Sequence, residues 1–216
     1  MNIMLVGYGN IGKIIYSLAK NDIVKIVNNF KEEPIIENLN IDIIIDFSNR
    51  ENIKYICEYA NKYNCKVLIG TTGLTIDDYN LLKELSTRVA VMIDSNYSKG
   101  ISILKKIIKE NIYLLKDYDI ELIDVHHKYK KDVPSGTMKS IESIINDNKY
   151  NVTSIRAGTI RGEHEVLFFG DDEYISIKHI ALSRKIFAFG AIESAKWLLN
   201  KEKGLFSYED YIFDKN

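Results

Sequence analysis

The chain has 216 residues, of which 46% are hydrophobic and 27% are charged, an ordinary composition for a globular protein. Its formal net charge of -1 argues against a protein that binds a nucleic-acid backbone, because such proteins carry a marked basic excess. Cys57 and Cys65 form neither a CxxC motif nor a Cys/His cluster, so no metal site is expected. There is no basic leader and no long apolar run, so we expect a cytoplasmic protein that does not bind membranes.

The first 95 residues alternate short apolar segments with helical ones. Strands are expected at 1–6, 23–28, 41–46, 66–69 and 89–93, and helices at 13–20, 52–61 and 76–85. This alternation predicts a doubly wound parallel sheet of the Rossmann-like class. Ligands bind at the carboxyl ends of the strands in such sheets. Polar or glycine residues close every expected strand: Gly7, Asn28, Asp46, Gly70 and Asp94.

The second half of the chain has a different order of elements. A long helix is expected at 99–115, then a strand at 119–125, a helix at 138–146, strands at 154–159, 165–170 and 174–181, and a final helix at 187–199. This order predicts an α+β domain with an antiparallel or mixed sheet. We therefore expect a first domain over residues 1–98, a second over 99–189, and a C-terminal region, 190–216, that packs back on the first.

A glycine-rich loop, Gly7-x-Gly9-x-x-Gly12, lies between the first strand and the first helix. In a dinucleotide fold this spacing permits a tight turn, a close approach of the backbone to a pyrophosphate, and close packing of helix on strand. The alternative is a glycine-rich turn without a ligand. Asn28 stands where such folds usually carry an acidic residue, and asparagine does not repel a 2′-phosphate. The choice between NADH and NADPH therefore stays open.

A second motif runs from His126 to Thr137, between a strand and a helix. Ser135, Gly136 and Thr137 can present donors at the helix start, where an anion binds readily. His126, His127 and Lys130 add donors suited to carboxylates and to proton transfer. Adjacent histidines at a strand end point to opposite sides, so their roles should differ. The alternative is a solvated basic loop with a helix cap. Residues 156–164 and 179–184 are interpreted as polar faces of a sheet.

Taken together, these motifs resemble the dihydrodipicolinate reductase family of the diaminopimelate route to lysine. The resemblance covers almost the whole chain, through GYGNIG, IDFS, GTTG, SNYSKG, HHKYKKDVPSGT, RAGTIRGEHEVLF and an SR-x-x-F-x-x-G-A segment that ends near Trp197. The loop pattern HH-x-x-K-x-D-x-P-S-G-T is highly specific. Two departures stand out: the usual Ala-Pro-Asn-Phe stretch reads Asp94-Ser95-Asn96-Tyr97, and the chain is short between the second strand and Ile41.

The resemblance implies a reaction and a set of residue roles. The enzyme would reduce a small cyclic dicarboxylate with NADH or NADPH. His126 would donate or accept a proton, and Lys130 would donate one. His127, Ser135, Gly136 and Thr137 would bind the substrate carboxylates. The cofactor would lie along Gly7, Tyr8, Gly9, Asn10, Ile11, Gly12, Asn28, Gly70, Thr71, Thr72, Asp94, Ser95, Asn96 and Tyr97.

The resemblance also implies a homotetramer built through the sheet of the second domain, which would then serve both substrate binding and oligomerisation. Two other functions fit the glycine loop. Another small dehydrogenase would keep this loop but would not need Ser135-Gly136-Thr137 beside the two histidines. A dinucleotide-sensing module would bind the cofactor without turnover, and it would not need His126 or Lys130.

Overall fold

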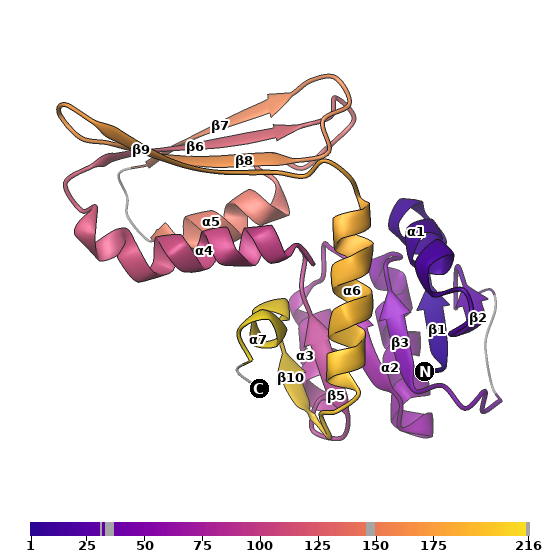
Figure 1. Ribbon diagram of the computed structural model, residues 1–216. Coiled ribbons are helices and arrows are strands. Elements are labelled where there is room, and N and C mark those ends of the chain that lie inside the picture. Colours follow the sequence, from indigo (N-terminus) through magenta and orange to yellow (C-terminus); the bar gives the residue numbers. More distant parts are fainter. Residues whose placement is uncertain (31, 33–36, 146–149, 215–216) are drawn as a thin grey trace. The chain divides into compact units, whose positions relative to one another are not determined.

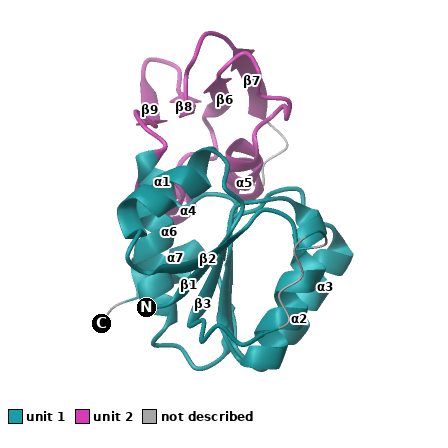
Figure 2. Ribbon diagram, turned by 90° about the vertical axis from the view of Figure 1, so that its right-hand side faces the viewer, with its two compact units in different colours: residues 1–97, 185–216 teal, residues 98–184 magenta. Residues whose placement is uncertain are grey.

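The computed structural model describes residues 1–30, 32, 37–145 and 150–214. The chain forms two compact units, one of residues 1–97 with 185–216 and the other of residues 98–184 (Figure 1, Figure 2). No helix in the described ranges is long and apolar enough to cross a membrane.

The first unit contains a six-stranded parallel sheet, which confirms the expected Rossmann-like class. Its strands lie in the order β10-β5-β4-β3-β1-β2, and each pairing is parallel. The bounds of the strands are β1 Ile3–Val6, β2 Ile23–Val27, β3 Ile43–Asp46, β4 Lys66–Ile69, β5 Ala90–Ile93 and β10 Gly204–Phe206. The edge strand β10 was not anticipated from the sequence.

Helices cover both faces of this sheet, which explains why its central strands are apolar without interruption. The helices α2 (Ile53–Tyr63) and α3 (Ile76–Leu85) share one core with Met4 and Val6 of β1. The helices α1 (Asn10–Ala19) and α6 (Lys185–Leu198) share the opposite core with Ile3 and Leu5. A 3-10 turn (Arg50–Asn52) precedes α2, and α7 (Tyr208–Phe213) closes the described chain.

The second unit is a mixed four-stranded sheet in the order β7-β6-β8-β9. Strands β6 (Asp119–His126) and β7 (Tyr150–Arg156) are parallel, whereas β8 (Glu163–Phe169) pairs antiparallel with β6 and with β9 (Tyr174–Ile180). The helices α4 (Lys99–Asn111) and α5 (Gly136–Ile145) pack on one face over the core formed by Ile120, Leu122, Val166 and Phe168. The α+β class expected for this half is confirmed.

Some boundaries differ from the expected ones. The helix expected at 99–115 ends at Asn111 and continues as a 3-10 turn (Ile112–Leu114). The strand expected at 154–159 instead spans Tyr150–Arg156, because it pairs in parallel with β6 from Ile120 to His126. The expected end of the α5 helix at residue 146 lies outside the described residues.

Candidate functional site

The glycine loop fits a pyrophosphate. Gly7 has a φ of +89°, and a Cβ there would lie 2.5 Å from the carbonyl oxygen of Phe47. A Cβ on Gly12 would lie 2.0 Å from the Gly7 oxygen, so this glycine lets α1 start directly against the loop. Nothing lies within 4 Å of the Cβ position at Gly9, which leaves the backbone open to a ligand. Gly9 supplies no side-chain cap, so the first N–H groups of α1 remain available to phosphate oxygens.

The remaining candidate cofactor residues lie mostly at neighbouring strand ends of the same sheet. The Asn28 side chain, after β2, is exposed, and its Oδ1 accepts the backbone N–H of Tyr8 at 3.2 Å. Thr71, after β4, is buried, and its hydroxyl oxygen accepts the N–H of Ser48 at 2.9 Å. A Cβ on Gly70 would collide with the Phe47 ring at 2.3 Å. Thr72 is exposed beside them.

The stretch from Asp94 to Tyr97 is tied into the fold. Both carboxylate oxygens of Asp94 accept backbone N–H groups, from Asn96 at 3.0 Å and from Tyr208 at 3.2 Å. The Tyr97 ring is 1% exposed, and its hydroxyl donates to the carbonyl of Ile69 at 2.7 Å. The carboxylate that departs from the family pattern therefore holds the start of α7, and the tyrosine ring belongs to the core. Ser95 is exposed.

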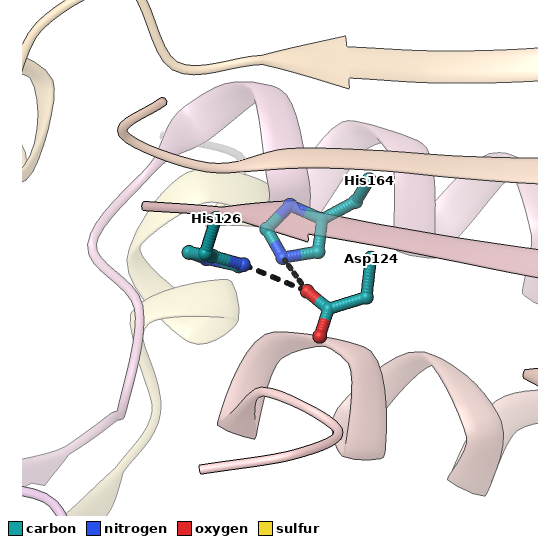
Figure 3. Close-up of side chains that lie close together, drawn as sticks. All are labelled: Asp124, His126 and His164. Carbon is teal, nitrogen blue, oxygen red and sulfur yellow. Dashed lines mark ion pairs between the residues drawn. The ribbon is translucent and has the colours of Figure 1, made fainter. Parts of the chain in front are cut away.

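In the second unit, sheet register gathers polar side chains on the face that carries the helices. Asp124 and His126 lie two residues apart on β6, so they point to the same side. Asp124 stands opposite His164 of β8, and His126 stands beside Arg156 of β7. Figure 3 shows Asp124, His126 and His164 converging, and all three are buried.

Asp124 is the centre of this cluster. Its Oδ1 lies 2.9 Å from Nδ1 of His126 and 3.6 Å from Nε2 of His164. Its Oδ2 accepts from Arg156 at 2.7 Å and from the backbone N–H of Ser135 at 2.9 Å. Burial alone would raise the pKa of Asp124, but His126, Arg156 and Ser135 together lower it below its usual range. The carboxylate therefore stays ionised. Its contact with His126 is close but not aligned as a hydrogen bond.

Two further histidines in the cluster are neutral supports. Burial, with His126 nearby, lowers the pKa of His164 to about 3. Its Nε2 lies 3.3 Å from the hydroxyl of Ser135. Burial also lowers the pKa of His179, whose Nε2 lies 3.2 Å from the hydroxyl of Ser98. The His164 ring packs against His126 with ring centroids 5.1 Å apart, and His179 lies beside His164 on β9. Because both pKa values are lowered, neither ring adds charge to the cluster.

Asp124, His126 and His164 bring three potential metal ligands within 4.8 Å of one another. The sequence showed no such grouping, because the three residues come from two strands. The Arg156 guanidinium already sits 2.7 Å from the same carboxylate. A divalent cation would be repelled by this guanidinium. We therefore interpret the cluster as one that positions the His126 imidazole, and not as a metal site.

In the loop after β6, several of the donors expected to contact substrate are already paired with carboxylates of the protein. Lys130 forms an ion pair with Asp132 at 2.9 Å, and the other oxygen of Asp132 accepts the N–H of Gly136 at 3.3 Å. The buried Ser135 caps α5 through its hydroxyl, which accepts the N–H of Met138 at 3.1 Å. Carboxylates of the protein itself thus occupy the N–H groups of Ser135 and Gly136 at the helix start. Thr137 follows in the first turn of α5.

Positive charge surrounds His127, which is partly exposed. Partial burial and the charges of Arg184, Lys130 and Arg161 lower its pKa. Such a setting stabilises an anion beside the ring. Arg161 and Arg184 come from the two segments interpreted as polar sheet faces, as do Arg156, His164 and His179. A signal that could have found the cluster is the two-residue spacing of Asp124 and His126 at the end of a strand.

The first unit has a parallel sheet with a glycine loop suited to a dinucleotide. The second unit has a buried imidazole–carboxylate pair and a cationic loop. Together these features define a nicotinamide-dependent oxidoreductase. The family model described as the N-terminus of dihydrodipicolinate reductase matches residues 1–97, and the model of its C-terminus matches residues 100–212. The chain belongs to the dihydrodipicolinate reductase family.

Relatives agree with this assignment. The chain is 38% identical over 213 residues to the 4-hydroxy-tetrahydrodipicolinate reductase of Thermosipho africanus, with 98% of each chain covered. It is 34% identical to that of Caldanaerobacter subterraneus, with 94% of each covered. Its fold resembles the dipicolinate-bound dihydrodipicolinate reductase of Paenisporosarcina sp. TG-14, with a TM-score of 0.76, 17% identity, and coverage of 97% of this chain and 99% of that one.

Proposed function

We propose that this protein reduces 4-hydroxy-tetrahydrodipicolinate to tetrahydrodipicolinate, in the diaminopimelate route to lysine. The family membership supports the reaction. The observation that carries the residue roles is the Asp124–His126 pair, in which an ionised, fully buried carboxylate lies 2.9 Å from Nδ1 of the imidazole. A nicotinamide dinucleotide, when bound, supplies the hydride. The roles below belong to the chain's own residues.

His126 handles the proton through its Nε2 atom. The negative charge of Asp124 lies 2.9 Å from Nδ1 and favours a proton on that nitrogen, which leaves Nε2 as the atom that exchanges a proton. A Cβ on Gly162 would lie 3.1 Å from Nε2, so glycine at this position keeps the space beside that atom free of a side chain. Lys130 provides a second proton donor. The positive charge of Lys130 stabilises negative charge as it develops on the substrate ring.

The substrate carboxylates bind to His127, Ser135, Gly136 and Thr137. In the structure, the carboxylate of Asp132 forms an ion pair with Lys130 and accepts the N–H of Gly136. A substrate carboxylate takes the place of Asp132 at these donors, so that Lys130 keeps an anionic partner. The positive charges near His127 hold the second carboxylate.

The cofactor is NADH or NADPH. Gly7 to Gly12 bind the pyrophosphate, Asn28 lies at the adenosine ribose, and Gly70 to Thr72 lie along the nicotinamide ribose. The backbone from Asp94 to Tyr97 lies near the nicotinamide. Asn28 is compatible with both NADH and NADPH, because its side chain carries no charge to repel a 2′-phosphate.

The experiment that tests this function couples the protein to the synthase that precedes it. Pyruvate and aspartate semialdehyde generate the substrate in place, and the loss of absorbance of NADH or NADPH is followed. We expect rapid oxidation that depends on the synthase, and the ratio of the two rates gives the cofactor preference. Binding of both cofactors without oxidation would instead favour a dinucleotide-sensing module or a different substrate.

We infer a homotetramer that assembles through the sheet face opposite α4 and α5. This face exposes Ile155, Phe169, Tyr174 and Ile180, with 38–63% of each residue accessible. We expect the mass in solution to be that of four chains, and Ile180→Lys to lower it. Ile76→Lys, which alters a residue of the first unit that is 72% exposed, is the control and should leave the mass unchanged. A monomeric wild-type chain would contradict the inference.

A further inference from the structure

Asn52 lies outside every motif discussed above, yet it is 1% exposed. It ends the 3-10 turn that leads into α2, and its backbone is already helical there. Asn49 caps this helical segment, because its side chain accepts the N–H of Glu51 at 3.0 Å. The buried side chain of Asn52 is therefore not used as a cap and can bond elsewhere in the fold.

The amide of Asn52 is used instead to join two strand ends. Its Oδ1 accepts the backbone N–H of Phe30 at 3.0 Å. Its Nδ2 donates to the carbonyl of Asn28 at 3.3 Å and to the hydroxyl of Ser48 at 2.9 Å. One side chain thus fastens the segment that follows β2 to the segment that follows β3.

Two of these partners, Ser48 and Asn28, lead on to candidate cofactor residues. The N–H of Ser48 donates to the hydroxyl of Thr71 at 2.9 Å, and its hydroxyl donates to Asp46 at 2.5 Å. The side chain of Asn28 accepts the N–H of Tyr8 at 3.2 Å. The hydrogen-bonded chain Tyr8–Asn28–Asn52–Ser48–Thr71 therefore touches the loops after β1, β2, β3 and β4. Strands β4, β3, β1 and β2 are consecutive in the sheet, so their carboxyl ends form one edge.

Asp46 anchors the middle of this network. It is fully buried at the end of β3, where burial raises its pKa to about 6 against the opposing effect of the Ser48 and Thr71 hydroxyls. Burying a carboxyl group costs free energy unless hydrogen-bond donors are held in position beside it. Asn52 donates to the same Ser48 hydroxyl that donates to Asp46, and so helps to orient that hydroxyl.

We propose that Asn52 is a positioning residue for the dinucleotide, acting through Asn28 on the adenosine side and through Ser48 on Thr71. It orders these loops before the cofactor arrives, so that binding does not have to order them. The identity of the ligand rests on the proposed function; the network itself does not. The side-chain oxygen of Asn28 is already committed to Tyr8, so Asn28 offers the ribose its N–H₂ group.

The test is direct titration of NADH and NADPH by fluorescence, with the full chain and without turnover. Asn52→Ala should raise the dissociation constants of both cofactors about tenfold, equivalent to about 1.4 kcal/mol, and leave their ratio unchanged. Turnover at saturating cofactor should stay within about twofold. Ser48→Ala, which removes one link of the network at a partly exposed position, should have a smaller effect in the same direction.

Two comparison variants separate positioning from general loss of stability. Ile56→Ala removes a fully buried side chain of α2 that has no part in the network. It should lower the melting temperature at least as much as Asn52→Ala, yet leave both dissociation constants unchanged. Asn28→Asp keeps an oxygen for Tyr8 and adds a charge, so it should shift preference toward NADH, unlike Asn52→Ala.

The outcomes are distinct. Unchanged binding in both Asn52→Ala and Ser48→Ala, with a wild-type chain that binds, would overturn the positioning role alone. An equal rise in Ile56→Ala would overturn it too, since any destabilisation would then suffice. A wild-type chain that binds neither cofactor would overturn both this inference and the proposed function.

Discussion

Replacing His126 with glutamine should lower turnover by about 10²–10⁴-fold, the usual contribution of a general acid or base. Glutamine has a similar length and can still face Asp124, but it cannot exchange a proton near neutral pH. The inhibition constant of pyridine-2,6-dicarboxylate should therefore change little. Steady-state rates in the coupled assay, with this inhibitor titrated separately, measure the two effects.

The adjacent histidine provides the matched control. His127→Gln should raise KM and the inhibition constant more than it lowers kcat, because His127 lies among positive charges that suit a carboxylate. Equal turnover in wild type and His126→Gln would remove His126 from the proton-transfer step. Equal losses of kcat in both variants would mean that the two histidines do not divide the work as we propose.

Asp124→Asn should affect both turnover and stability. The substitution leaves the Arg156 guanidinium without its charged partner in a largely buried position, and such losses cost about 3–5 kcal/mol. It also removes the negative charge beside Nδ1 of His126, so kcat should fall on the order of 10²-fold. Denaturant unfolding and the coupled assay measure the two effects. A double variant, Asp124→Asn with Arg156→Met, should regain part of the stability but none of the turnover.

The stability difference between wild type and Asp124→Asn should depend on pH. The pKa of Asp124 is lowered in the folded protein, so its contribution is complete above the unfolded value, about 3.9, and is lost as pH falls toward the folded value. The difference in unfolding free energy should therefore be constant from about pH 5 to 7 and shrink below about pH 4. A difference that does not depend on pH would mean that the ion pair is not its source.

The first unit could be predicted from the sequence because local patterns determine most of it. Strands such as β3 and β4 are short apolar runs, and α3 begins with a capping box between Thr75 and Asp78. Strand β10 escaped prediction because it has only three residues, starts at a glycine, and pairs with a strand more than 100 residues earlier. Nothing local distinguishes it from a turn.

In the candidate site too, residues in one continuous loop could be predicted, whereas residues brought together by the fold could not. His126 and Lys130 could be proposed from one continuous loop, since their neighbours in sequence carry the chemistry. Asp124, Arg156 and His164 come together only through cross-strand register, which the sequence pattern does not provide. Asn52 was missed because two of its partners, Asn28 and Phe30, lie 24 and 22 residues earlier in the sequence.

The first unit is discontinuous along the chain, and this affects how it can form during synthesis. Its sheet takes its last strand from residues 204–206, and the face bearing Ile3 and Leu5 is covered in part by α6, which starts at Lys185. When the ribosome has made the first hundred residues, α1 is present but the part of that apolar face which α6 covers is still exposed. Completion of the first unit must wait for nearly the entire polypeptide, so a truncated translation product should expose a hydrophobic surface and be recognised by chaperones or proteases.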